Sequence, residues 1–187
     1  MNSTNHPPAS GPESNQILHT ARLTLRRLTL EDARFVLELL NEPDFLNFIG
    51  DRGVRSVEDA KGYISRTAIS AYERYGYGML LVGTKETGES VGICGLIRRE
   101  FLEDAEIGFA IHSKFGGLGF ASEAAAAVMN YGLRELKLDR IVAIVTGDNV
   151  RSIRVLEKSG LEFEKKITWP DDGTELDLYA FPLPRNR

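Results

Sequence analysis

The clearest pattern in the chain is a change from alternating to helical hydrophobic spacing near residue 115. Apolar side chains at 107, 109 and 111 alternate with other residues, which predicts a β-strand over 105–111. From residue 121 onward, apolar residues recur at the three- and four-residue spacing of one helix face, which predicts a helix over about 120–136. Between them lies a loop that contains Gly116, Gly117 and Gly119. This strand, loop and helix are the centre of the predicted fold.

The remaining elements follow from the same patterns. Strands are predicted at 20–28, 77–83, 90–98, 141–145, 162–168 and 174–181. Capping patterns that begin at Thr29 and Ser56 each predict a helix, the first ending before Pro43. We expect a loop or broken helix over 45–55 and a short helix that starts after Asn149 and ends at Gly160.

The predicted helices have defined inner faces, and the strands have a predicted arrangement. The inward residues of the second and last helices are expected to be Ala60, Tyr63, Ile64, Thr67, Ala68, Ala71, Val150, Ile153 and Leu156. The hairpin between 77–83 and 90–98 makes this part of the sheet antiparallel, and the apolar run at 141–145 suits a strand covered on both faces. The sequence predicts one mixed α/β domain over 16–187, after a disordered leader at 1–15 that is rich in Asn, Ser, Pro and Gly.

The glycine-rich loop has the features of an anion site. Glycines allow positive φ and close approach of a ligand, and the first N–H groups of the following helix lack helical partners. The alternative is a tight turn without a ligand. Phe120 and Ala121 stand where a P-loop needs Lys and then Ser or Thr, so that motif is excluded. A dinucleotide fingerprint is weak, since Ser122 replaces its third glycine.

Composition limits the classes of function. A formal net charge of −4, without a basic run, argues against a nucleic-acid partner. No apolar stretch approaches a membrane span, and no signal-peptide pattern is present, so we expect a cytoplasmic protein without a membrane partner. The one cysteine, Cys94, excludes an intrachain disulfide, and the three histidines lack metal-ligand spacing. We therefore expect no metal.

Three segments carry a resemblance to a known family. They are Ala21–Thr29 (ARLTLRRLT), the block from Glu106 to Ala124 with GLGFASEA after the strand, and Asn149–Leu161 (NVRSIRVLEKSGL). Together and in this order, they resemble the GNAT superfamily of acyl-CoA-dependent N-acetyltransferases, most closely the branch that acetylates ribosomal-protein N-termini. The resemblance covers about residues 18–183.

The resemblance implies a fold, a co-substrate and a reaction. The strands at 105–111 and 141–145 would splay apart at the centre of a mostly antiparallel sheet with flanking helices. Acetyl-CoA would bind with its pyrophosphate on the loop and its pantetheine arm in the gap. The implied contacts are Ile107, Phe109, Ala110, Ile111, Gly116, Gly117, Leu118, Gly119, Phe120, Ala121, Ser122, Asn149 and Ser152. A neutral primary amine would attack the thioester directly, without a metal or a covalent enzyme intermediate, in a monomer or homodimer.

The sequence departs from the family pattern at three positions. The family often has Arg or Gln in place of Gly116 and a polar Lys or Gln in place of Leu118. Many members have a tyrosine acid where spacing from Asn149 places Leu156. These losses leave two possible functions, a catalytic N-acetyltransferase or an acyl-CoA-binding module with weak turnover.

Candidate catalytic residues each have a plainer alternative. Glu106 is either the general base for the amine or an edge carboxylate in water. Asn149 and Ser152 either contact the CoA arm, with Ser152 protonating the thiolate, or simply begin a helix. Two aromatic features either border the acceptor site or pack on their neighbours. They are Trp169 and the group Tyr72, Tyr75 and Tyr77. The acceptor stays open among a peptide N-terminus, an antibiotic, a polyamine and an amino acid.

Overall fold

The computed structural model describes residues 16–181 of the 187-residue chain. The predicted leader at 1–15 and the last six residues of the predicted domain lie outside this range. Within the described part, no helix combines the length and the apolar character needed to cross a bilayer.

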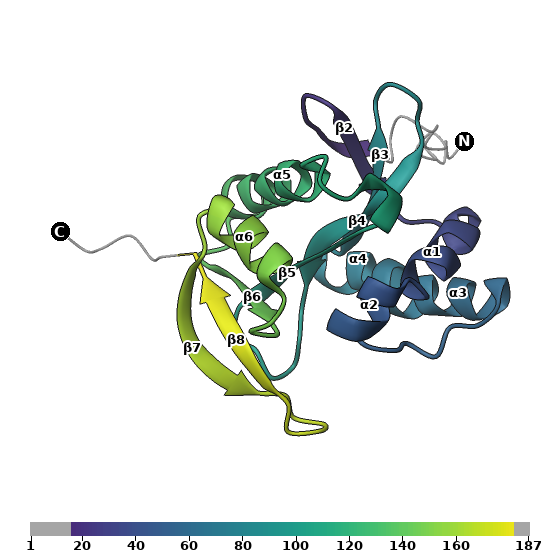
Figure 1. The fold of residues 1–187 in the computed structure, drawn as a ribbon. Helices are drawn as coiled ribbons and strands as arrows, with labels where there is room; N and C mark the ends of the chain where they lie inside the picture. The colour runs from purple at the N-terminus through teal and green to yellow at the C-terminus, as the bar shows by residue number, and fades with distance from the viewer. Residues whose placement is uncertain (1–15, 182–187) are drawn as a thin grey trace, which may run out of the picture.

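Eight strands form one sheet in the order β1-β2-β3-β4-β5-β6-β8-β7 (Figure 1). β5 and β6 are parallel, and every other neighbouring pair of the described strands is antiparallel. The strands are β1 (Gln16–His19), β2 (Leu23–Arg27), β3 (Met79–Thr84), β4 (Ser90–Ile97), β5 (Ala105–Ile111), β6 (Ile141–Val145), β7 (Glu162–Thr168) and β8 (Glu175–Ala180). The predicted mixed, mostly antiparallel sheet is confirmed.

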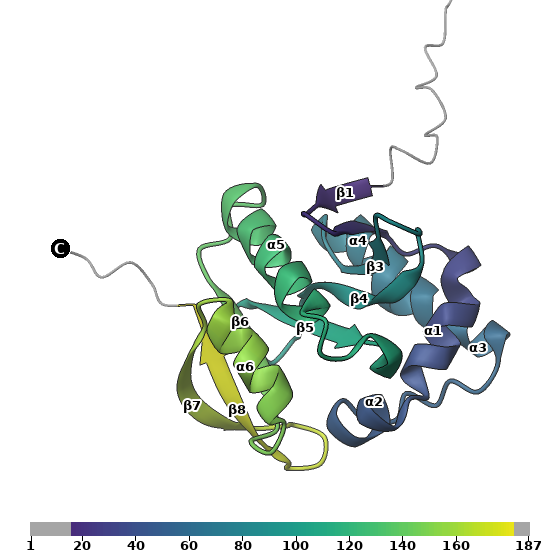
Figure 2. The same ribbon diagram turned by 45° about the horizontal axis from the view of Figure 1, so that its top comes forward.

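The helices gather in two groups around the sheet. α5 (Phe120–Arg134) contacts β4, β5 and β6, and α6 (Val150–Lys158) lies beside it (Figures 1 and 2). The second group comprises α1 (Ala33–Leu40), α2 (Pro43–Phe48), α3 (Val57–Ile64), a π-helical segment (Ser65–Ile69) and α4 (Ser70–Tyr75). The short 3₁₀ helices Leu30–Asp32 and Ser113–Phe115 precede α1 and the glycine-rich loop.

β5 and β6 separate within the sheet. They pair in register only at Ala105 with Ile141 and at Glu106 with Val142. β5 then continues along β4 as far as the pair of Ile111 with Gly92. Beyond Glu106, the two parallel strands therefore leave a gap between their backbones, which confirms the predicted splay.

Several element predictions need correction. The expected first strand is a pair, β1 and β2, because Ala21 and Arg22 form a bend between them. The segment predicted as a loop or broken helix over 45–55 is divided between the two: α2 begins at Pro43, where proline loses no helical hydrogen bond, and ends at Phe48, and 50–55 has no regular structure.

Two positions expected to face inward do not. Thr67 is exposed because the π-helical segment shifts the inner face of its helix. Val150 is 51% exposed, since it occupies the first turn of α6, ahead of the part that packs on the sheet.

Candidate functional site

The glycine-rich loop presents a run of unpaired backbone donors. Gly117 and Gly119 have φ of +78° and +80°, the left-handed region that favours glycine, and Gly119 is the N-cap of α5. The first bond at the start of the helix runs from Glu123 N–H to Gly119 O at 3.1 Å. Residues 116 and 117 form a turn, and after it, in the described part of the chain, the N–H groups of residues 119–122 have no acceptor. With the helix dipole behind them, these donors suit an anion such as a phosphate.

A clasp from the bend between β1 and β2 holds this loop. Arg22 donates through Nη1 to Leu118 O at 2.9 Å and through Nε to Glu123 Oε2 at 2.7 Å, and its guanidinium lies over the Phe120 ring. Thr20 donates to Glu123 Oε1 at 2.5 Å. Burial acts to raise the pKa of the Glu123 carboxyl, but the hydrogen bonds from Thr20 and Arg22 hold it below its ordinary value. Sequence reasoning missed this clasp, whose members are about a hundred residues apart.

The gap beside β5 exposes polar backbone groups. His112 N–H donates to Val91 O at 2.9 Å, and in an antiparallel pair every second residue directs its backbone groups to the same neighbouring strand. Residues 112, 110, 108 and 106 therefore direct their N–H and C=O toward β4. Ala110 is one of these, so any contact from it with a ligand in the gap would come from its side chain. Phe109 and Ile111 direct their backbone groups away from β4, into the gap. Ile107 lies at its closed end, next to the paired Glu106 and Val142.

The start of α6 agrees with the capping interpretation. Asn149 Oδ1 accepts a hydrogen bond from Ser152 N–H at 3.1 Å, which makes Asn149 a helix cap. The Ser152 hydroxyl is half-buried and has no partner among the described residues. Leu156, at the position of the family's tyrosine, is 2% exposed and belongs to the core. No acid group therefore stands at that position.

The burial of Glu106 decides between its two predicted environments. It is 4% exposed, so the alternative of an edge carboxylate in water is wrong. Arg99 Nε donates to its Oε2, and Arg99 Nη2 lies 3.5 Å from Oε1. Burial raises the pKa of the Glu106 carboxyl, while the positive charges of Arg99 and Arg52 oppose that rise. A buried carboxyl with a raised pKa fits a general base, but its partner Arg99 was not predicted.

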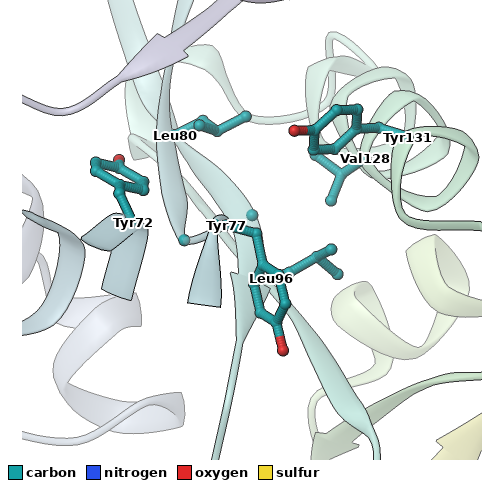
Figure 3. A pocket seen from close by; sticks show the side chains of 9 residues that line it. Tyr72, Tyr77, Leu80, Leu96, Val128 and Tyr131 are labelled. Atoms are coloured by element: carbon teal, nitrogen blue, oxygen red, sulfur yellow. The ribbon is translucent and has the colours of Figure 1, made fainter. Parts of the chain in front are cut away.

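Two hollows lie away from the loop. One is a cavity of about 10 Å³, too small for an acceptor; Tyr72, Tyr77 and Tyr131 are among the side chains that line it (Figure 3). Tyr72 is buried and its hydroxyl accepts from Leu28 N–H at 3.0 Å, which supports the packing interpretation for this residue. A groove of about 380 Å³ is lined by Leu102, Val142, Ile167 and Leu178, among others. Val142 is the register partner of Glu106 on a parallel strand, so both side chains project from the same face of the sheet.

The remaining candidates are the cysteine and the possible metal ligands. Cys94 is fully buried and burial raises the pKa of its thiol, as expected of a small core residue. Across the described residues, no three His, Cys, Asp or Glu side chains meet as a metal site would require.

Comparisons with known proteins agree with this arrangement. The sequence profile of the acetyltransferase (GNAT) domain matches residues 22–162. The "Uncharacterized N-acetyltransferase p20" of Bacillus licheniformis is 33% identical over 174 residues, which is 90% of this chain and 96% of the relative. The crystal structure of the acetyltransferase from Agrobacterium tumefaciens str. C58 has a TM-score of 0.76 at 25% identity, covering 96% of this chain and 99% of that one. The RimL ribosomal L7/L12 alpha-N-protein acetyltransferase, in complex with coenzyme A, shares the fold with a TM-score of 0.76 at 22% identity, over 88% of this chain and 96% of its own. The chain therefore belongs to the GNAT family and is an N-acetyltransferase.

Proposed function

We propose that the protein transfers an acetyl group from acetyl-CoA to a primary amine by direct attack within a ternary complex. Two features carry this proposal: the unpaired N–H groups of residues 119–122 at the start of α5, and the gap between β5 and β6. A pyrophosphate on the loop would leave the pantetheine arm free to enter the gap. Phe109 and Ile111 would pair with its amides as an added strand would.

The reacting groups would meet near the closed end of the gap. Glu106, which projects from the same sheet face as the groove residue Val142, would take a proton from the acceptor amine, directly or through one water. The neutral nitrogen would attack the thioester carbonyl, whose developing negative charge a backbone N–H of β5, such as that of Phe109, would stabilise. Formation of the C–N bond and cleavage of the C–S bond would release the CoA thiolate. The Ser152 hydroxyl would donate its proton to that sulfur and would recover, directly or through water, the proton that the acylated nitrogen loses as the amide forms.

A pair of isosteric variants tests the phosphate site. A Cβ placed on Gly117 would meet no atom within 4 Å, and Asn and Asp both tolerate its left-handed backbone. Gly117→Asn and Gly117→Asp therefore share the same backbone strain and differ in one negative charge. We expect calorimetry to show CoA binding to the Asp variant at least about tenfold weaker than to the Asn variant, as two adjacent anions would repel. Equal affinities in the two folded variants would place the phosphates elsewhere.

The acceptor is best identified by activity. A screen with acetyl-CoA and a panel of peptides with free N-termini, polyamines, amino acids and aminoglycosides would report thiol release. Because RimL acts on a ribosomal protein's α-amino group, as its name states, peptides are the first class to test. Thiol release with no class of amine, under conditions where CoA binds, would favour an acyl-CoA-binding role.

A further inference from the structure

The carboxylate of Glu106 is held by a residue outside its own strand. Arg99 lies in the turn between β4 and β5. Its guanidinium contacts both carboxylate oxygens, one at a shorter distance than the other. Nε donates to Oε2 at close range, whereas Nη2 stands 3.5 Å from Oε1. Oε2 is thus occupied, and Oε1 keeps most of its capacity to accept a proton.

Arg99 is in turn fixed from its other side. Its guanidinium lies 4.9 Å from the ring centre of Trp169, which follows β7 at the start of the turn into β8. Phe101 packs edge-on against the same ring with centroids 5.1 Å apart, and Trp169 Nε1 donates to Asp171 at 3.2 Å. A cation on an aromatic face in a partly buried site is held more firmly than one in water. The turn after β7 therefore limits how Arg99 can move, and through Arg99 how Glu106 can turn.

We propose that Arg99 is a positioning residue for catalysis: it holds Glu106 as an oriented carboxylate with Oε1 available to the acceptor amine, and Trp169 holds Arg99 in place. This inference rests on the proposed role of Glu106 as the base. Phe101 also lines the 380 Å³ groove, so this aromatic support adjoins the face from which the amine would approach.

The charges that face Glu106 make the proposal testable by pH. Arg99 and Arg52, the latter in the loop between α2 and α3, both favour its ionised form, against the effect of burial. Removing the contact with Arg99 would leave burial opposed only by Arg52. The carboxyl would then lose its proton at a higher pH, and the acid limb of the activity profile would move up.

The experiment compares pH profiles of kcat/KM, from pH 5 to 9, for the parent, Arg99→Gln, Arg99→Lys, Trp169→Leu and Glu106→Gln. Arg98→Gln is the matched control, since Arg98 bonds the Glu103 carbonyl rather than Glu106. We expect the acid limb of Arg99→Gln to rise by about one pH unit or more, the scale of losing an adjacent opposite charge. Trp169→Leu should move it in the same direction by less. Arg99→Lys should keep the limb near that of the parent but lower kcat, with an unchanged KM for acetyl-CoA.

Each outcome decides between the proposals. If Arg99→Gln follows the parent profile while Glu106→Gln loses activity, the base is supported and the role of Arg99 is overturned. If Glu106→Gln keeps the parent profile, both the base and its positioning residue are overturned. If Arg99→Gln does not fold, as judged by circular dichroism, Arg99→Lys decides: parental kcat overturns the positioning role, and reduced kcat with parental KM supports it.

Discussion

The clasp of Thr20 and Arg22 on Glu123 should make a measurable contribution to stability. Glu123 lies in the first turn of α5, with its side chain 18% exposed. Its carboxylate accepts from Thr20 Oγ1 at 2.5 Å, Arg22 N–H at 2.8 Å and Arg22 Nε at 2.7 Å. Replacement by glutamine keeps the side-chain length and one acceptor oxygen. It removes the negative charge. Its amide NH2 replaces the second carboxylate oxygen, so a hydrogen-bond donor would face another donor.

The expected loss follows from these contacts. A hydrogen bond to a charged group contributes about 1.5–3 kcal/mol, and a carboxylate in the first turn of a helix adds about 0.3–1 kcal/mol. Because the glutamine retains part of the network and the site is partly hydrated, we expect Glu123→Gln to lower the free energy of unfolding by about 2 kcal/mol. For a chain of this size, this corresponds to a melting temperature about 4–8 °C lower.

The pH dependence separates this clasp from a general loss of packing. The folded-state pKa of Glu123 is lowered, so its contribution is complete above the unfolded-state pKa of about 4.3 and is lost as pH falls through the folded value. The difference in melting temperature between parent and variant should therefore shrink as pH is lowered from 7 toward 3. Glu135→Gln is the control, since Glu135 is exposed at the other end of α5 and should change stability by less than about 0.5 kcal/mol. The explanation would be refuted if Glu123→Gln and this control had the same melting temperature at pH 7. It would also be refuted if the difference in melting temperature between parent and Glu123→Gln did not depend on pH.

Three further predictions concern catalysis and the sheet. Glu106→Gln should bind acetyl-CoA normally and lose roughly 10²-fold or more in kcat/KM at pH 7, with partial recovery at high pH where the free amine needs no base; activity within twofold of the parent from pH 6 to 9 would remove the assignment. Ser152→Ala should lower kcat while leaving the melting temperature near that of the parent, because its backbone N–H still bonds Asn149; an unchanged kcat at saturating substrate would leave Ser152 a helix-start residue. Gly95→Ala should destabilise the fold by more than about 2 kcal/mol in denaturant titrations, since its Cβ would lie 2.3 Å from the backbone oxygen of Gly78; a loss below about 0.5 kcal/mol would contradict the packing seen between β3 and β4.

Local sequence patterns were sufficient for most of the elements. The boundaries of β6 and β7 agree with their predicted ranges, and Gly160 ends α6 with a φ of +86°, as expected of a left-handed cap. The glycine-rich loop was predicted for the same reason: positive φ and free helical N–H groups are properties of a few neighbouring residues. The splay of β5 and β6 came from resemblance to a family, because no local spacing encodes it.

Contacts between distant segments depended on the tertiary structure. Arg22 and Glu123 are separated by 101 residues, and Arg99 reaches Trp169 on another hairpin, so no periodicity within one element relates them. The environment of Glu106 is where the structure adds most to the sequence. The sequence places a carboxylate at the start of a strand but does not determine whether it is buried. Only the packed sheet, with Arg99 folded back from the turn, makes that carboxylate a buried and paired group. Ionisation depends on the charges and the solvent within a few ångströms, and folding brings these together from segments that are far apart in the chain.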